Sequence, residues 1–488
     1  MQSDIDPPTF IRKEGNMIET RNNHKVYPLT AAQKFHFFYL NSCPKKEVVN
    51  IGISVILQTE LDWNVLKDSI RKACSRCDSM RLRLTQDSDG TWYQYLADPQ
   101  EDQEEKEIEF HDFTNETIDE ANEIMHQWTF VPFDHEQKPL NRIVMIKLRD
   151  GWNGIYLLVD HLSMDAQAII CFMKDVIELY CSTLYENVEV PKPMFSYIEQ
   201  LEKDLAYEQG CRAKDRDTAY FREKIESSEP IYNGIMGTQK LEAAREQLHD
   251  PNLRCAFNVS DSVDATLDSF HLEEEPSERL MKFCEENHVS MSCLLIMGLR
   301  TYFQKMNGCD DVSLNTAIAR RATLKEKKCG GTRIHSFPIR TIIPEDKTFL
   351  EGIYEIRDLQ NEYFRHANFD PVQYFALRAK TYPQKERGLT YEPISLTYQP
   401  LSLQDKELEK LGNIQYRTKW FQNGATTQGV YLTVMHHPED NGFDFNFEHQ
   451  IKAVSKDELE YLYYYLCKIM FKGAENPNLL IGDIIKLV

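Results

Sequence analysis

A strand–turn–strand–helix pattern in the first half of the chain constrains its fold more than any other feature. Two apolar runs, 143–148 and 155–159, are separated by Asp150-Gly151, a dipeptide typical of hairpin turns. After a polar hexamer, 160–165, apolar side chains recur at helical spacing over 168–180. The hexamer therefore joins the end of a buried strand to the start of a buried helix, where rigid elements hold a short loop in place.

Strand and helix patterns of the same kind return in the second half of the chain. Helices are predicted at 277–287 and 291–306, a strand at 312–318, and a hairpin at 430–435 and 443–447. For a chain of 488 residues, of which 42% are hydrophobic, two cores are expected rather than one. The sequence therefore predicts an α/β (α+β) fold with two lobes of related build.

We place the boundary between the two lobes after residue 195. A flexible N-terminal segment, 1–24, precedes a first lobe at 25–195 that carries the polar hexamer. The second lobe, 196–488, includes a charged and weakly patterned linker at about 200–260. The acidic run 98–109 is interpreted as a solvated loop.

The net charge and the distribution of apolar residues exclude several classes of function. The formal charge of −21 opposes binding to nucleic acid or to anionic lipid. No apolar run approaches the ~20 residues that span a bilayer, and the polar N-terminus lacks the apolar region of a secretory signal. The twelve cysteines are scattered, without the density of a disulfide scaffold. We therefore expect a cytoplasmic protein with no membrane span and no nucleic-acid partner.

One pair of cysteines has the spacing of a metal motif. Cys74 and Cys77 form a CxxC within a helical pattern. A tetrahedral zinc site needs a second pair or nearby histidines, and neither accompanies this one. Packing in the core is therefore the better interpretation, and we expect no metal site.

The polar hexamer Asp160-His161-Leu162-Ser163-Met164-Asp165 contains a His-x-x-x-Asp string. Such a string is weak by itself, and a second one occurs at His436 to Asp440. That second string runs into Asn441-Gly442, a hairpin turn signal, and is interpreted as a solvated turn. A lone histidine at a strand end is also more often structural than catalytic, so the surroundings of His161 must decide its role.

Those surroundings resemble the condensation domains of nonribosomal peptide synthetases, in the chloramphenicol-acetyltransferase-like superfamily. The core motif of that family, HHxxxDG, corresponds to residues 160–166, where Asp160, His161, Asp165 and Ala166 stand at its defined positions. Further segments resemble family motifs in the correct order between about residues 27 and 470: 27–33, 76–81, 133–142, 195–197, 316–321, 336–340 and 366–371. Each match is weak alone, and their order carries the resemblance.

The resemblance implies two chloramphenicol-acetyltransferase-like lobes with an active-site tunnel between them. An acyl thioester on a phosphopantetheine arm, carried by an acyl or peptidyl carrier protein or by CoA, meets an amine or hydroxyl acceptor. His161 would remove the acceptor's proton or hold the acceptor in line. No acyl-enzyme and no tightly bound cofactor is implied. The family's aspartate turns away to pair with an arginine, so Asp165 would fix the loop through Arg321, with Arg320 as a weaker substitute.

The chain departs from the family motif at several positions. Asp160 replaces the first histidine, and a carboxylate close to the ring would favour protonated His161. Ala166 replaces glycine where the pantetheine arm passes, and His335 stands where the family often has asparagine. Gln33 lines the tunnel or serves as a core or capping residue; both interpretations stay open, whereas a structural role is preferred for His335.

Three functions are compatible with these residues. The leading one is a freestanding condensation-type acyltransferase that forms an amide or ester, because no adenylation or carrier segment fits into the chain. The second is a catalytically silent module that binds a carrier protein or assembly partner, favoured by Asp160 and Ala166. The third is an epimerase-like variant, which would need a further carboxylate that no motif identifies.

Overall fold

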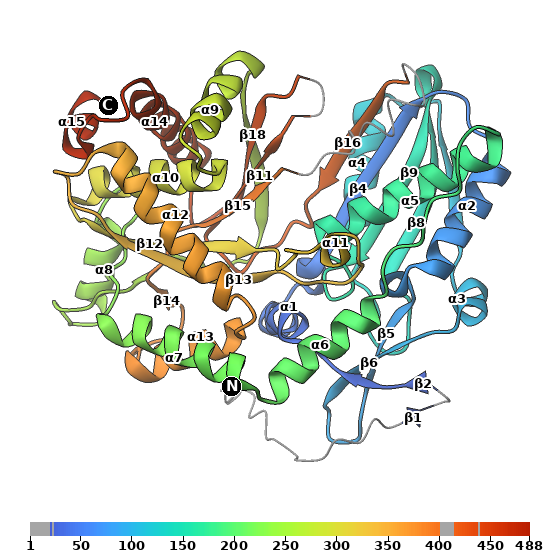
Figure 1. The fold of residues 1–488 in the computed structure, drawn as a ribbon, viewed down its shortest axis with the longest axis horizontal. Coiled ribbons are helices and arrows are strands. Elements are labelled where there is room, and N and C mark those ends of the chain that lie inside the picture. Colours follow the sequence, from blue (N-terminus) through green and yellow to red (C-terminus); the bar gives the residue numbers. More distant parts are fainter. Residues whose placement is uncertain (1–19, 22–23, 401–413, 438–439) are drawn as a thin grey trace.

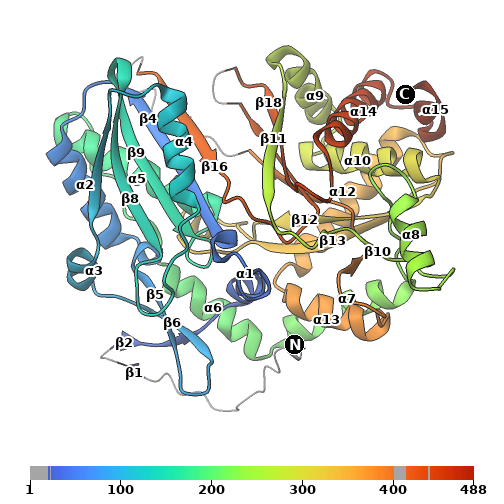
Figure 2. The same ribbon diagram turned by 180° about the vertical axis from the view of Figure 1, so that it is seen from behind.

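Two β-sheets flanked by helices organise the molecule (Figure 1; Figure 2). The computed structural model describes residues 20–21, 24–400, 414–437 and 440–488. The segment 1–24, which we expected to be flexible, therefore lies almost wholly outside the described residues. The two mixed sheets with their flanking helices confirm the predicted fold class.

The first sheet has the strand order β16-β4-β9-β8-β7. Its strands are β4 (Asn50–Gln58), β7 (Ile108–Phe113), β8 (Asn141–Leu148), β9 (Trp152–Asp160) and β16 (Tyr416–Phe421). β8 and β9 form the predicted hairpin, and Asp150 in their connection has a φ of 61°. Helices α2 (Trp63–Arg76) and α5 (Ala166–Leu184) cover one face of this sheet, and α4 (Ile118–Thr129) covers the other.

Strand β16 comes from the second half of the sequence. It pairs with β4 in antiparallel register, from Tyr416 opposite Leu57 to Phe421 opposite Gly52, and Figure 2 shows it crossing to the first sheet. Phe421 is buried in the core beneath α4. The boundary expected after residue 195 therefore does not separate the two sheets completely, because this strand completes a sheet built from the first half.

The second sheet has the strand order β11-β18-β17-β15-β12-β13. Its strands are β11 (Ala265–Leu272), β12 (Asp311–Ile318), β13 (His335–Ile342), β15 (Ser395–Gln399), β17 (Val430–His436) and β18 (Phe443–Gln450). One face packs against helices that share its large core: α9 (Glu274–Glu286), α10 (Met291–Asn307), α12 (Phe349–His366), α14 (Lys456–Glu475) and α15 (Ile481–Leu487). The predicted helices, strand and hairpin of this half are confirmed.

The charged segment at 200–260 contains helices. These are α6 (Tyr197–Gln209), α7 (Arg212–Ser227) and α8 (Gln239–Gln247). Tyr197 and Leu201 of α6 pack in a cluster with first-half residues, and Phe221 of α7 packs in the core of the second sheet. The segment bridges the halves as an ordered element.

The acidic run 98–109 also differs from its interpretation. It contains helix α3 (Pro99–Glu105), opened by a capping box in which Glu101 accepts a hydrogen bond from the Asp98 backbone. Asp102 is buried and forms ion pairs with Arg83 and Lys106, at 2.8 and 2.9 Å. The solvated-loop interpretation is wrong here, because a buried arginine requires a buried acidic partner.

A smaller sheet and several short elements complete the described fold. The strand order of the smaller sheet is β3-β6-β5, and helix α1 (Ala31–Ser42) follows its first strand. The remaining elements are β1 (Thr20–Arg21), β2 (His24–Lys25), β3 (Tyr27–Pro28), β5 (Leu82–Gln86), β6 (Trp92–Leu96), β10 (Ala256–Phe257), β14 (Leu389–Thr390), α11 (Leu324–Lys327), α13 (Pro371–Thr381), η1 (Lys46–Val49), η2 (Asp78–Arg81) and η3 (Arg149–Gly151).

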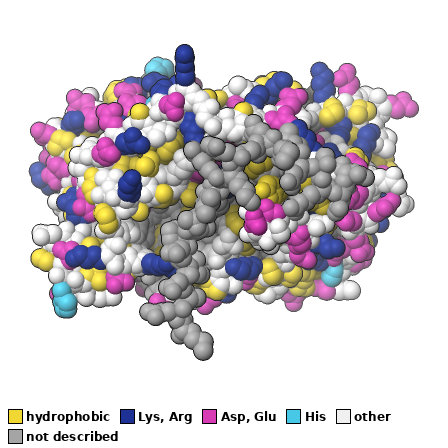
Figure 3. Space-filling model, turned by 90° about the horizontal axis from the view of Figure 1, so that it is seen from below, with side chains coloured by type: hydrophobic (Ala, Val, Ile, Leu, Met, Phe, Trp, Pro, Cys, Tyr) yellow, Lys and Arg dark blue, Asp and Glu magenta, His cyan; other side chains and the backbone are white. Residues whose placement is uncertain are grey.

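The molecular surface carries charges of both signs. On the face shown in Figure 3, acidic and basic side chains are interspersed over the described part of the chain. Within the described ranges, no helix has the length and apolar character needed to cross a membrane.

Candidate active site

His161 lies where β9 ends and the loop to α5 begins. Its backbone N–H donates to the carbonyl of Val49 at 2.8 Å, which ties the loop to the start of β4. Ser163 closes the loop, because its backbone N–H and its hydroxyl both donate to the Asp160 carbonyl, at 2.9 and 2.7 Å. His161 as a residue is partly exposed, and the turn holds its imidazole between two rigid elements.

A second histidine stacks on His161. The ring of His36, from α1, lies 3.8 Å from the His161 ring between centroids, with an interplanar angle of 20°. The His36 side chain is buried, and its Nε2 has no hydrogen-bond partner within the described ranges. Sequence reasoning missed this residue, although it follows directly on the segment 27–33 that resembles the family's opening motif.

Burial keeps both imidazoles of this pair neutral near pH 7. Desolvation lowers the pKa of His161, an effect partly opposed by Asp165, by the backbone and by Asp160. The pKa of His36 lies well below its usual value, first because of burial and then because of the charge His161 would carry. A neutral imidazole can accept a proton, so the electrostatics of the pair suit a general base.

The carboxylate of Asp160 binds groups other than the His161 ring. Its Oδ2 lies 2.7 Å from Nε2 of His135, and its Oδ1 accepts the backbone N–H of Leu162 at 2.7 Å. Asp160 is fully buried, so these two partners satisfy it. The adjacent carboxylate does not hold His161 protonated, because desolvation of the ring lowers the His161 pKa by more than the charge of Asp160 raises it. His135 was also missed by sequence reasoning, although it follows Phe133-Asp134 of a recognised motif.

The structure brings Asp165 and Arg321 together in a buried ion pair. The Nη2 of Arg321 lies 2.8 Å from Oδ1 and 2.9 Å from Oδ2 of Asp165. Asp165 also caps α5 by accepting the backbone N–H of Ala168 at 3.0 Å, and it accepts the Arg333 backbone N–H at 3.0 Å. One carboxylate therefore joins the loop after His161 to the segment between β12 and β13.

That segment of the second half reaches the histidine itself. The hydroxyl of Thr332 lies 3.5 Å from Nδ1 of His161. Gly331, with a φ of 85°, donates its N–H to the Ser79 hydroxyl at 2.7 Å and accepts from Arg321 at 2.9 Å. A side chain at position 331 would collide with the ring of Tyr197. The site is thus assembled from both halves of the molecule.

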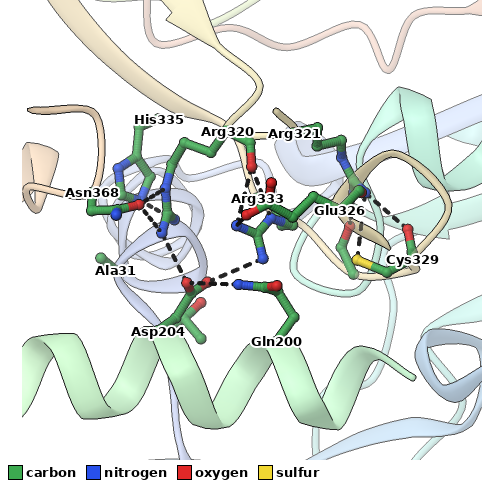
Figure 4. Close-up of polar contacts among 12 residues, drawn as sticks. Ala31, Gln200, Asp204, Arg320, Arg321, Glu326, Cys329, Arg333, His335 and Asn368 are labelled. Carbon is green, nitrogen blue, oxygen red and sulfur yellow. Dashed lines mark hydrogen bonds and ion pairs between the residues drawn. The ribbon is translucent and has the colours of Figure 1, made fainter. Parts of the chain in front are cut away.

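Arg320, the alternative partner for Asp165, points elsewhere. It donates to Asp204 of α6 at 2.9 Å, and Figure 4 shows Arg320 and Arg333 both directed toward that carboxylate. Its φ of 54° is uncommon for a residue other than glycine. Arg320 also donates to Nε2 of His335 at 3.0 Å. Arg320 and Arg333 therefore connect the segment between β12 and β13 to α6 through Asp204.

His335 is fully buried. Its Nδ1 donates to the carbonyl of Ala367 at 2.9 Å, and Arg320 donates to its other nitrogen. Burial, followed by the charge of Arg320, holds the pKa of His335 well below its usual value. Both ring nitrogens of His335 are therefore occupied by hydrogen bonds within the protein.

Gln33 and Ala166 flank the site in different ways. Gln33 is fully buried and forms a capping box with Thr30 at the start of α1. Its side chain also donates to Gln94 at 2.7 Å and to the Leu162 carbonyl at 3.1 Å, so capping and loop support describe it better than an open lining position. Ala166 begins α5 and is partly exposed.

Both cysteines of the CxxC motif lie in the core beneath α2 and α5. Burial raises the pKa of Cys74 to about 11 and that of Cys77 to about 12. These thiols are protonated at neutral pH, in keeping with core packing.

Two mixed sheets, the first of which is completed by a strand from the second half of the sequence, and a histidine at the junction of β9 and α5 define a fold of the chloramphenicol-acetyltransferase class. The sequence model of one family in this class, described as "Condensation domain", matches residues 23–487. The chain therefore belongs to the condensation domain family.

Curated relatives are synthases that are much longer than this chain. The chain is 22% identical over 457 residues to surfactin synthase subunit 1 of Bacillus subtilis (strain 168), covering 92% of this chain and 12% of that protein. It is 20% identical over 491 residues to bacitracin synthase 3 of Bacillus licheniformis, covering 98% of this chain and 7% of that protein. The chain thus spans less than a fifth of the length of these relatives.

Solved structures share the fold over nearly the whole chain. One is the starter condensation domain of rhizomide synthetase, as a variant in complex with C8-CoA, with 16% identity, a TM-score of 0.76, and 94% of this chain and 96% of that chain covered. Another is the condensation domain of Monacolin K polyketide synthase, with 14% identity, a TM-score of 0.76, and 93% and 99% covered.

Proposed function

We propose that this condensation domain is an active acyltransferase that moves an acyl group from a phosphopantetheine thioester to an amine or hydroxyl acceptor. Condensation domains are in general amide-forming transferases. The observation that carries the proposal for this chain is the neutral imidazole of His161, stacked on His36 at 3.8 Å in a site to which both halves contribute.

In this reaction the acceptor attacks the thioester carbonyl and transfers its proton to His161. Because Nδ1 faces Thr332, we assign Nε2 as the proton acceptor. The bond from carbon to sulfur then breaks, and the same proton passes to the departing thiolate. The products are the amide or ester and the free pantetheine thiol. Assistance by a positioned imidazole is worth roughly 10²–10⁴-fold in rate.

The other residues of the site orient this imidazole. The ion pair between Asp165 and Arg321 fixes the loop after His161, and His135 hydrogen-bonds the buried Asp160. His36 excludes water from one face of the ring. The donor is an acyl-CoA or an acylated carrier protein, as in the starter domain solved with C8-CoA.

Thiol release tests the proposal. The protein is incubated with a panel of acyl-CoAs and acylated carrier proteins together with amine and alcohol acceptors, and free thiol is followed. We expect release with at least one pair and loss of that release in His161→Ala. His111→Ala, at an exposed position of β7, serves as the matched control. Equal rates in wild type and His161→Ala would contradict the role of His161.

A catalytically silent module remains the second candidate, because Asp160 and Ala166 depart from the core motif. It predicts no thiol release with any pair, together with retained binding of a carrier protein measured by calorimetry.

A further inference from the structure

A histidine and an aspartate face each other at the outer edge of the second sheet. The edge strand β11 runs beside β18 (Figure 1), and their antiparallel register places His271 directly opposite Asp444. Side chains of directly opposed residues lie on the same face of a sheet. The Nδ1 of His271 is 2.9 Å from Oδ1 of Asp444, so this contact orients the His271 ring.

The turn between β17 and β18 brings a second histidine and a second carboxylate to the same point. Asp440 in this turn lies 2.9 Å from Nε2 of His271 through Oδ2, and 3.2 Å from Nδ1 of His437 through Oδ1. One ligand atom of each of these three residues lies within 4.8 Å of the others. This is the region of the second His-x-x-x-Asp string, but its His436 contacts the Tyr398 hydroxyl instead, at 3.2 Å.

Backbone contacts hold His437 and Asp440 in place. The N–H of His437 donates to the carbonyl of Gly442 at 2.8 Å, and the N–H of Gly442 donates to Oδ1 of Asp440 at 2.9 Å. Asn441 has a φ of 58°, a conformation that asparagine adopts more readily than most residues. A Cβ at position 442 would lie 2.8 Å from Cε1 of His271, so glycine is needed where the turn passes the ring.

The converging atoms are the donor set of a divalent transition-metal site. Zn²⁺ binds imidazole nitrogen and carboxylate oxygen at ~2.0–2.2 Å in tetrahedral geometry, which puts its ligand atoms ~3.3–3.4 Å apart. The distances of 2.9 and 3.2 Å from Asp440 to the two rings are close to this spacing. The carboxylates of Asp440 and Asp444 together balance the charge of a divalent ion. Imidazole suits zinc, copper and nickel, whereas magnesium and calcium prefer oxygen ligands.

We propose that His271, His437 and Asp440 bind a divalent transition metal such as Zn²⁺ at the edge of the second sheet. Nε2 of His271, Nδ1 of His437 and an oxygen of Asp440 supply three ligands, and water takes the fourth position. Asp444 accepts the N–H of His271 Nδ1, the outer contact that typically orients a metal-binding imidazole. The ion thereby joins β11 to the hairpin of β17 and β18. This site does not depend on the proposed acyl transfer.

The expected absence of a metal site was drawn from Cys74 and Cys77, which take no part in this cluster. Both thiols are buried in the core of the first sheet, whereas the proposed ligands come from the second sheet. Histidine ligands on two strands and a turn leave no regular spacing in the sequence, because the register of β11 with β18 brings them together.

Zinc binding to the full chain tests the proposal. Protein freed of metal with a chelator is titrated with ZnCl₂ by calorimetry, with MgCl₂ and CaCl₂ as comparison ions. We expect wild type to bind a single Zn²⁺ at this site and to bind neither comparison ion there. His271→Gln and His437→Gln should each weaken binding by at least ~100-fold, and Asp444→Asn, which removes only the outer contact, by ~10–100-fold. His111→Gln, at an exposed position of β7, is the matched control and should bind as wild type does.

Each alternative to the site gives a different result. If the imidazoles and carboxylates form ion pairs only, wild type will bind no zinc, and the proposal is overturned. If zinc binds equally to wild type, His271→Gln and His437→Gln, the ion lies elsewhere on the chain, and the proposal is overturned as well. Unchanged affinity in Asp444→Asn would remove the orienting role of Asp444.

One measurement on wild type does not depend on how the variants fold. Anomalous X-ray diffraction from crystals grown with ZnCl₂ should place the ion ~2.0–2.2 Å from the ligand atoms of His271, His437 and Asp440. A zinc ion bound only at other side chains would contradict the site.

Discussion

Replacement of Asp165 or Arg321 tests whether the ion pair between them fixes the loop that carries His161. The pair is bidentate, with 2.8 and 2.9 Å from Nη2 to the two carboxylate oxygens, and its side chains are 1% and 3% exposed. Removing one partner of such a pair leaves a buried charge and costs about 3–5 kcal/mol. Asp165→Asn keeps an oxygen that can accept the Ala168 N–H, so the cap of α5, worth about 1 kcal/mol, is preserved.

We therefore expect Asp165→Asn and Arg321→Met each to lower the free energy of unfolding by about 3–5 kcal/mol. The double variant should lose at least about 1 kcal/mol less than the sum, because it leaves no unpaired charge. Urea unfolding followed by tryptophan fluorescence measures all three. Lys282→Ala, which removes an exposed pair with Glu286 at 3.8 Å, is the control and should change stability by less than about 0.5 kcal/mol. Losses below about 1 kcal/mol for either single variant, or strict additivity, would show that this pair does not fix the loop.

Three further predictions concern groups in or near the site. His36→Ala should admit water beside His161 and raise the midpoint of the acid limb of kcat/KM toward pH 6.5. His36→Phe keeps the His161 ring covered and should leave this midpoint unchanged; equal pH profiles for both variants would contradict the prediction. His135→Ala should lower the free energy of unfolding by about 1–3 kcal/mol, since Asp160 then retains only a backbone partner; an unchanged urea midpoint would count against it. The carboxyl of Glu448 has its pKa raised from 4.5 to about 7, so the folded chain holds a proton that the unfolded chain releases, and wild-type stability should fall as pH rises through that window. Glu448→Gln should remove about 1–3 kcal/mol of this fall after allowance for partial solvent exposure; parallel curves for both proteins would contradict it.

The elements with local signals could be predicted from the sequence. The hairpin of β8 and β9 and the helix after it follow from two apolar runs, a turn dipeptide and a helical period, all within one short stretch. The loop between them could be recognised as a candidate site because several weak family motifs occur in the correct order around His161.

Contacts between distant segments could not be predicted in this way. Strand β16 pairs with β4 although the two strands are far apart in the sequence, and no local pattern marks its partner. The stacking of His36 on His161 depends on how α1 packs against the loop 160–165. The pairing of His135 with Asp160 depends on how the segment before β8 packs against the same loop. The burial of Asp102 in the acidic run could not be predicted, because it depends on the buried Arg83, which is distant in the sequence.

The proposed function depends above all on a neutral imidazole at position 161 that removes the acceptor's proton during acyl transfer. The decisive measurement is the rate of amide formation, by mass spectrometry, for wild type and His161→Ala with one acylated phosphopantetheine donor and one amine across pH 5–8. We predict a loss of roughly 10²–10⁴-fold in the variant and a wild-type rate that rises with pH to a plateau through a midpoint below 6.5. Equal rates, or a wild-type rate that falls as pH rises over this range, would rule out His161 as the base.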